Sequence, residues 1–135
     1  MTISKIMEIG PLVPAFEEEK IVILFGPTAT NELREISVIH EFQDVPNNAL
    51  TKGNTLLIGE QTYTIEEVGS DANKNLEELG HISVYFRSGQ NEVLPGAIVV
   101  SPEIFQQLRL AIVFNFKHKN FLCYISPCQS SLFSI

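Results

Sequence analysis

The sequence predicts an all-β domain, a small closed or partly open barrel of short strands with one short helix at residues 71–79. Two observations favour this fold class. About seven or eight short runs rich in β-branched and aromatic residues follow one another, separated by glycine, proline and asparagine. The chain also lacks the regular alternation of strand and helix that builds parallel α/β sheets. A sandwich of the same strands is the alternative that the pattern leaves open.

Turn residues bound the first strands. Ile3–Ile9 alternates loosely and stops at a glycine–proline pair. Ile21–Phe25 is a continuous apolar run, which predicts a buried strand, and Ser37–Phe42 is the next strand. Thr55–Ile58 and Thr62–Val68 are separated by Gly-Glu-Gln, which predicts a hairpin.

One segment predicts a helix more clearly than the rest. Ser70 or Asp71 is a suitable N-terminal cap. Leu76 and Leu79, at positions i and i+3, are expected to face inward, and Gly80 stands where a left-handed residue ends a helix.

The remaining elements are shorter. Asn31–Glu35 is expected to form one helical turn with its first residue as the cap. His81–Phe86 follows the main helix as a strand that alternates cleanly between an apolar and a polar face. Val93–Val100 is a strand with a proline–glycine kink. Pro102–Leu108 is a weak helix candidate, and Ala111–Phe116 is the last strand.

Length and composition suit one domain at residues 1–116, followed by a divergent tail at 117–135 without acidic residues. The net charge of −7 and only nine scattered lysines and arginines argue against nucleic acid and anionic membranes as partners. No apolar run approaches the ~18 residues of a spanning helix, and charged residues interrupt the N-terminus where a signal peptide needs an apolar core. We therefore expect a cytoplasmic chain without direct membrane insertion.

Motifs of the common nucleotide and metal enzymes are missing. There is no phosphate-binding glycine loop, no dinucleotide fingerprint and no zinc-protease motif. His118, Cys123 and Cys128 form H-x4-C-x4-C, but a structural zinc site needs a fourth ligand and tighter pairing. We therefore expect two reduced thiols, no metal and no cofactor.

His40, at the end of an apolar strand, is the candidate for chemistry. A neutral imidazole nitrogen can attack phosphorus directly and hold the phosphoryl group. The protein must then fix the tautomer through the other ring nitrogen and offer donors to the phosphoryl oxygens. The alternative is a structural histidine at a strand end.

Three segments of the sequence resemble a known protein family, and this resemblance bears on whether His40 has a chemical or a structural role. They are EISVIHEF at 35–42, ALTKGNTLLIGEQTYTIEEVGSDANKNLEELGHISVYF at 49–86 and LPGAIVV at 94–100. Together they resemble the IIA component of the glucitol/sorbitol-specific phosphoenolpyruvate-dependent sugar phosphotransferase system. The resemblance covers about half of the chain, is weaker in the N-terminal third, and is lost after Phe116.

The resemblance implies a phosphoryl carrier. The phosphorylated histidine of that family falls on His40, which would accept the group from HPr and pass it to a cysteine of the IIB component, for uptake through the membrane IIC component. His81 is a second candidate, as a neighbour that hydrogen-bonds the phosphoryl group or orients His40. Its alternative is an exposed histidine near a helix C-terminus. We expect an exposed apolar rim from Ile36, Val38 and Phe42 to serve as the docking surface.

Two other functions stay open. One is a non-catalytic barrel that binds a transporter or regulator subunit, with His40 structural. The other is a small-molecule barrel, which requires an apolar pocket with few polar groups. The oligomeric state, the exact polyol and the reactive nitrogen are open as well, although analogy favours the distal nitrogen.

Overall fold

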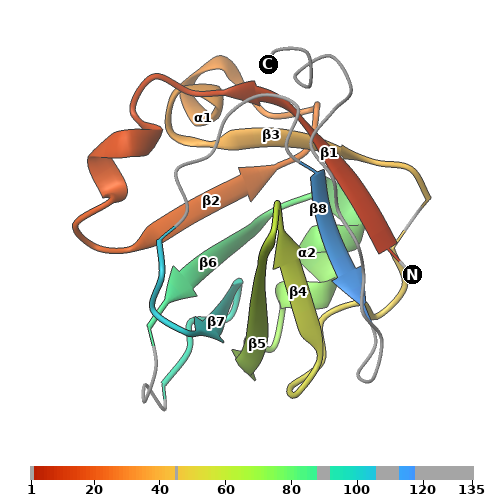
Figure 1. Ribbon diagram of the computed structural model, residues 1–135. Coiled ribbons are helices and arrows are strands. Elements are labelled where there is room, and N and C mark those ends of the chain that lie inside the picture. Colours follow the sequence, from red (N-terminus) through yellow and green to blue (C-terminus); the bar gives the residue numbers. More distant parts are fainter. Residues whose placement is uncertain (1, 45, 88–91, 106–112, 118–135) are drawn as a thin grey trace.

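The computed structural model describes residues 2–44, 46–87, 92–105 and 113–117. Within them the strands close into a barrel in the order β1-β3-β2-β6-β7-β5-β4-β8, and β8 pairs again with β1 (Figure 1). The predicted barrel is thus confirmed. The strands are β1 (Thr2–Ile9), β2 (Ile21–Phe25), β3 (Val38–Phe42), β4 (Thr55–Ile58), β5 (Gln61–Val68), β6 (Ile82–Phe86), β7 (Ala97–Ser101) and β8 (Val113–Lys117). The helices are the short 3-10 helix η1 (Val13–Phe16), α1 (Asn31–Ile36) and α2 (Ala72–Leu79).

The barrel mixes antiparallel and parallel pairs. β2 with β3, and β6 with β7, run parallel, and the other neighbours are antiparallel. A parallel pair needs a crossover, and α1 supplies it between β2 and β3. The predicted hairpin is confirmed as β4 and β5, with Ile58 paired to Gln61.

Side-chain alternation places the core inside the barrel. Ile82, Val84 and Phe86 of β6 are fully buried, as their alternation predicts. β2 is covered on both faces: Val22 and Leu24 join the core, while Phe25 packs with residues beneath α1. A strand covered on both faces explains the continuous apolar run.

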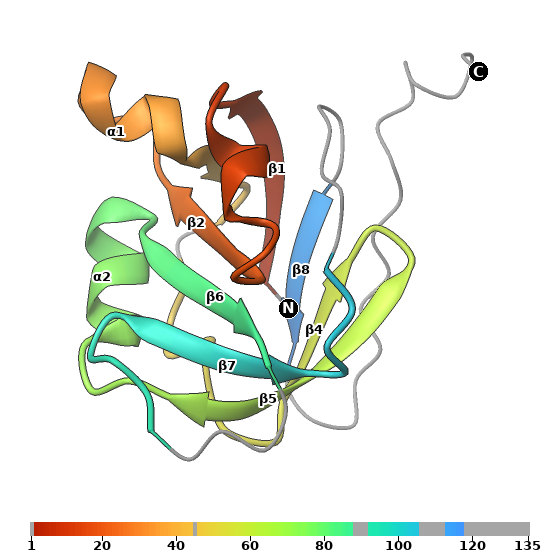
Figure 2. The ribbon, with the colours of Figure 1, turned by 90° about the vertical axis from the view of Figure 1, so that its left-hand side faces the viewer.

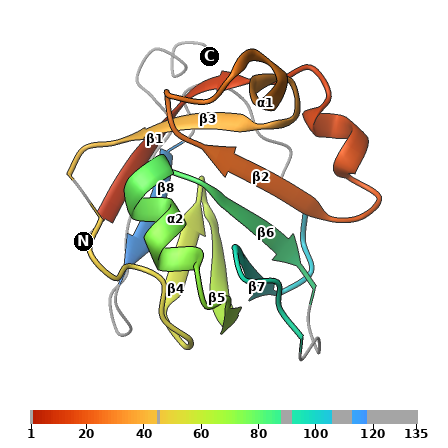
Figure 3. The same ribbon diagram turned by 180° about the vertical axis from the view of Figure 1, so that it is seen from behind.

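Helix α2 closes one end of the barrel. Figures 2 and 3 show it lying across that end, and Ala72 and Leu76 are buried in the core cluster. The predicted inward position of Leu79 is wrong, because this last helical residue lies at the rim and is 42% exposed. Asp71 stands at the N-cap, one of the two positions predicted for it, but its side chain makes no capping hydrogen bond.

A few other boundaries differ from the expectation. The cap of α1 is Thr30, whose hydroxyl accepts from the Leu33 N–H, and not Asn31. β7 begins only at Ala97 because the Pro95-Gly96 turn precedes it. The first residues of the weak helix candidate, 102–105, are not helical, and 106–108 lie outside the described residues. The tail at 118–135 lies outside them as well.

Two side chains fasten α2 to the segment before β4. Asn73 bonds both backbone groups of Leu50, accepting from its N–H at 2.9 Å and donating to its carbonyl at 2.8 Å. A Glu77 carboxylate oxygen accepts from the Asn48 N–H at 2.7 Å. The helix is therefore held in place by polar contacts as well as by its apolar face. In the part of the chain that the structure describes, no helix has the length and apolar character to cross a membrane.

We expect Asn73→Ala to lower the free energy of unfolding by about 2 kcal/mol, because it leaves both backbone groups of the buried Leu50 unpaired. Lys74→Ala, an exposed neighbour on the same helix, should stay within about 0.5 kcal/mol of wild type. Chemical denaturation measures both. Equal losses would show that the Asn73 clamp does not hold the helix.

Candidate functional site

His40 points into the barrel and is almost completely buried, at 1% exposure. It pairs with Ile6 across β1 and β3, just before a bulge at Met7. Its neighbour on the same face, Phe42, packs edge-on against the imidazole at 4.9 Å between ring centres. The ring therefore sits in an apolar wall at the end that α2 closes.

Both ring nitrogens of His40 are hydrogen-bonded. Nε2 lies 2.6 Å from the Gly80 carbonyl oxygen, and Nδ1 lies 2.8 Å from the Ser4 hydroxyl. A carbonyl can only accept, so Nε2 carries the proton and donates to Gly80. In the neutral ring Nδ1 then holds a lone pair and accepts from Ser4, whose side chain is fully buried.

Burial keeps this histidine neutral. Desolvation lowers the pKa of His40 from 6.5 to about 4, and the hydrogen bond to the Gly80 carbonyl only partly opposes that shift. At neutral pH the ring is thus an uncharged imidazole. An uncharged ring keeps one lone pair, which is the first requirement for a nitrogen nucleophile.

The cover over His40 is backbone. Gly80 follows α2 with φ of +69°, and its N–H closes the helix on the Leu76 carbonyl at 2.9 Å, in the left-handed ending that the sequence predicts. Its own carbonyl is left to accept from His40. Gly26 lies against it, because a Cβ built on Gly80 would come within 2.8 Å of the Gly26 backbone. The end of β2 and the end of α2 therefore meet directly above Nε2.

Arg34 of α1 holds the loop that carries Gly26. Its Nε donates to the Ala29 carbonyl at 3.1 Å, and Nη2 donates to the Pro27 carbonyl. Its Nη1 also forms an ion pair with Glu8 at 2.6 Å. The loop beside the histidine is thus fixed to α1 and β1.

His81 lies next to this cover but faces other groups. Its ring stacks on Phe25 at 4.5 Å between centres, and its Nδ1 donates to the Leu24 carbonyl at 3.1 Å. It is half-buried, whereas His40 is buried. His81 therefore lies at the same end of the barrel as His40, because it follows Gly80 in the chain. Its ring has its own contacts, with Phe25 and Leu24.

The expected exposed rim around His40 is wrong. Val38 is fully buried because it shares the inward face with His40, and Ile36 and Phe42 are half-buried. The exposed apolar residue beside the site is Leu79.

The sequence reasoning missed Ser4 and the Gly80 carbonyl. A serine among the apolar inward positions of β1 is the one local hint of a polar partner. His118, Cys123 and Cys128 lie outside the described residues. Among the residues that are described, no group of three or more potential metal ligands comes together.

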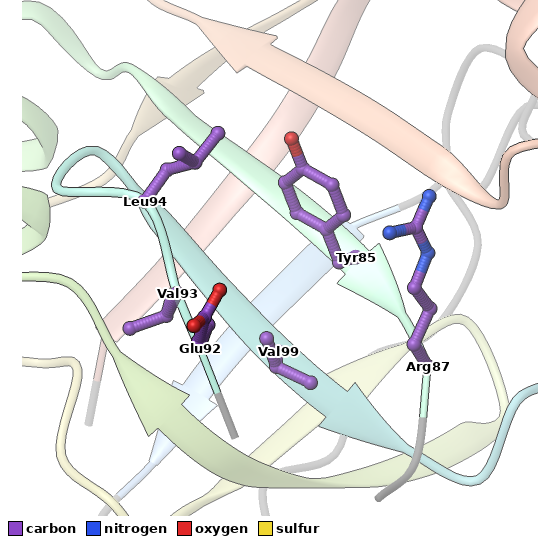
Figure 4. A pocket seen from close by; sticks show the side chains of 6 residues that line it. All are labelled: Tyr85, Arg87, Glu92, Val93, Leu94 and Val99. Atoms are coloured by element: carbon purple, nitrogen blue, oxygen red, sulfur yellow. The ribbon is translucent and has the colours of Figure 1, made fainter. Parts of the chain in front are cut away.

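A pocket of about 520 Å³ lies away from the histidine. Figure 4 shows its lining from β6, β7 and the segment before β7. Tyr85 and Val99 pair with each other and alternate with core residues, so this pocket is on the outer face of the barrel. Arg87 and Glu92 also line it, so it is not the apolar pocket with few polar groups that a small-molecule barrel requires.

Comparison with known proteins identifies the family of this chain. The family model described as "PTS system glucitol/sorbitol-specific IIA component" matches residues 1–114. The chain belongs to this family. The protein named PTS system glucitol/sorbitol-specific EIIA component of Shigella flexneri is 30% identical over 115 residues, which is 84% of this chain and 92% of that protein.

Two further relatives agree with this family. The protein of the same name from Escherichia coli (strain K12) is 31% identical over 100 residues, 73% of this chain and 80% of its own length. The crystal structure of the PTS system IIA component from Enterococcus faecalis V583 has a TM-score of 0.78 and 30% identity, and covers 84% of this chain and 98% of that one. His40, Gly80 and Ser4 all fall within the residues that the family model matches.

We expect the stability of this IIA chain to fall as pH drops from about 6.5 to about 4. In this window the unfolded state binds a proton on His40 that the folded state does not, so lower pH favours unfolding. The contribution of this one group reaches roughly 3 kcal/mol at pH 4. Denaturation against pH should show a shallower loss of stability in His40→Gln than in wild type. Identical profiles for wild type and His40→Gln would contradict the buried neutral ring.

Gly80→Ala should lower the free energy of unfolding by more than Gly53→Ala does. Both positions have positive φ, +69° and +92°, which costs an L-residue about 1–2 kcal/mol. The Gly80 methyl also meets the Gly26 backbone, whereas nothing lies within 4 Å of one at Gly53. Denaturation should therefore show the larger loss for Gly80→Ala, and NMR titration should show the His40 pKa rising toward 6.5. Equal losses with an unchanged His40 pKa would mean that the methyl is accommodated without lifting the cover.

Proposed function

We propose that this chain is a cytoplasmic phosphoryl carrier of the sugar phosphotransferase system. His40 accepts a phosphoryl group from the phosphohistidine of HPr and passes it to a cysteine of a IIB component. Through IIB and the membrane IIC component, glucitol or sorbitol is then phosphorylated during uptake. Membership in the IIA family and the names of the relatives support this role.

The observation that carries the proposal is the setting of His40. It is a neutral imidazole whose Nδ1 is held by a buried hydroxyl, while Nε2 lies beneath Gly80, a half-exposed residue. A carrier needs a nucleophilic ring that is fixed through one nitrogen and can be reached at the other. Nε2 is therefore the acceptor in this proposal.

Transfer requires the Gly80 carbonyl to leave Nε2. Nε2 first loses its proton to solvent while Nδ1 takes one up, so the ring stays neutral. The Nε2 lone pair then attacks phosphorus while the N–P bond of the donor histidine breaks, and its electron pair returns to the donor ring. His81 follows Gly80 in the chain and so moves with the cover. Its ring N–H would donate to the phosphoryl oxygens once the cover has moved, which gives the second candidate histidine a supporting role.

The second candidate function is a non-catalytic interaction module. Its support is the burial of His40, since a histidine at 1% exposure with both nitrogens bonded is also what a structural residue requires. This alternative predicts no stable phosphorylation.

Intact-mass analysis after incubation with phosphoenolpyruvate, enzyme I and HPr tests the proposal. We expect an acid-labile gain of one phosphoryl group in wild type and in His81→Ala, and no gain in His40→Ala. The reason is that an N–P bond forms only on the attacking imidazole and hydrolyses readily in acid.

A known acceptor protein serves as the control for the relay proteins. If that acceptor is phosphorylated while the wild-type chain is not, the carrier proposal fails and the interaction module takes its place. If His40→Ala still gains the group, the assignment of the acceptor fails. Circular dichroism of each variant separates loss of transfer from loss of fold.

A further inference from the structure

The buried hydroxyl of Ser4 lies 2.8 Å from Nδ1 of His40. We propose that Ser4 is a positioning residue that holds Nδ1 in both tautomers of His40, first as donor and then as acceptor, and so directs phosphoryl transfer to Nε2. This inference rests on the proposed function.

The two partners of the ring differ in what they can do. The Gly80 carbonyl only accepts, so it pairs only with a protonated Nε2. A serine hydroxyl donates or accepts after a simple rotation. In the resting structure Nε2 is protonated, and Ser4 therefore donates to the lone pair of Nδ1 at 2.8 Å.

Phosphorylation reverses these roles. For Nε2 to attack, its proton must leave and one must be placed on Nδ1, so that the ring stays neutral. Solvent is the source and sink of these protons once the Gly80 segment has moved. The Nε2–P bond then forms as the donor's N–P bond breaks, and the donor ring regains the electron pair and takes up a proton. The positive charge that the His40 ring gains is balanced by the phosphoryl oxygens, and its Nδ1–H donates to the Ser4 oxygen. The same side chain thus partners Nδ1 before and after transfer.

Burial explains why the reaction goes to Nε2. Nδ1 faces Ser4, which is 0% exposed and lies on β1 inside the barrel wall. Nε2 faces Gly80, which is half-exposed. A partner protein can reach the second nitrogen by displacing one backbone segment, whereas the first is enclosed by strands.

The presence of a polar residue at this buried position also requires an explanation. The β1 position nearest on the same face is Ile6, a core residue, and burying a hydroxyl without a partner is unfavourable. Alanine would fill the same space with no polar group to bury. The bond to His40 is therefore what the hydroxyl contributes at this position.

The test combines NMR of the ring nitrogens with phosphoryl transfer from phospho-HPr. Wild type, Ser4→Ala and Ser4→Thr are labelled with ¹⁵N-histidine. In wild type at neutral pH we expect a protonated Nε2 at rest, and in the phospho-form phosphorus on Nε2 with a protonated Nδ1. Ser4→Ala should slow transfer by about tenfold, the effect of one lost hydrogen bond, and should lower the protonated fraction of Nδ1 in the phospho-form, where the Ser4 oxygen accepts from Nδ1–H. Ser4→Thr, which keeps the hydroxyl, should recover most of the lost rate.

The outcomes separate the two proposals. A wild-type chain that is not phosphorylated, with the relay shown active, overturns both. Phosphorylation on His40 with an unchanged rate and unchanged Nδ1 protonation of the phospho-form in Ser4→Ala overturns the role of Ser4 alone. Phosphorus found on Nδ1 of His40 likewise overturns the role of Ser4 alone. If Ser4→Thr is too large to fold, the Nδ1 protonation of phosphorylated Ser4→Ala still decides, because a merely structural serine would leave it unchanged.

Discussion

The hydrogen bond from His40 Nε2 to the Gly80 carbonyl connects the barrel wall to the helix that closes the barrel. Its length of 2.6 Å depends on three elements meeting at one point: β3 supplies the imidazole, α2 ends in a left-handed glycine, and β2 brings Gly26 against that glycine. Only residues without a Cβ permit this approach of two backbones. The clamp of Asn73 on Leu50 holds the other side of α2, so the closed end is fastened from both directions.

This closure gives the histidine two properties that oppose each other. Burial in an apolar wall lowers the pKa of His40 and keeps the ring neutral, which favours nucleophilic attack. The same burial covers Nε2, which prevents attack. A carrier can reconcile the two only if the cover moves when a partner binds. The cover is well suited to that, because it consists of one carbonyl at a helix end, on a half-exposed glycine that has no side chain to displace.

Much of this arrangement could be predicted locally. The strand of His40, the helix that ends at Gly80 and the alternation of β6 all follow from periodicity and from a glycine at a helix end. The burial of His40 could not be predicted, because Val38 and Ile39 are both apolar and the pattern does not say which face of β3 lies inside. Ser4 could not be assigned either. It is separated from His40 by 36 positions, and the two meet only because β1 pairs with β3 in a register that shifts at a bulge.

In the proposed carrier cycle, the site works through the difference between two oxygens. A backbone carbonyl can stabilise only the tautomer that is unable to react at Nε2, so its hydrogen bond belongs to the resting state and must be given up. A hydroxyl can follow the proton to either tautomer, so its hydrogen bond persists through the cycle. It follows that the free energy lost on displacing Gly80 opposes phosphorylation and is regained when the group leaves. In the proposed cycle the unphosphorylated form is thereby stabilised, which would favour passing the phosphoryl group onward.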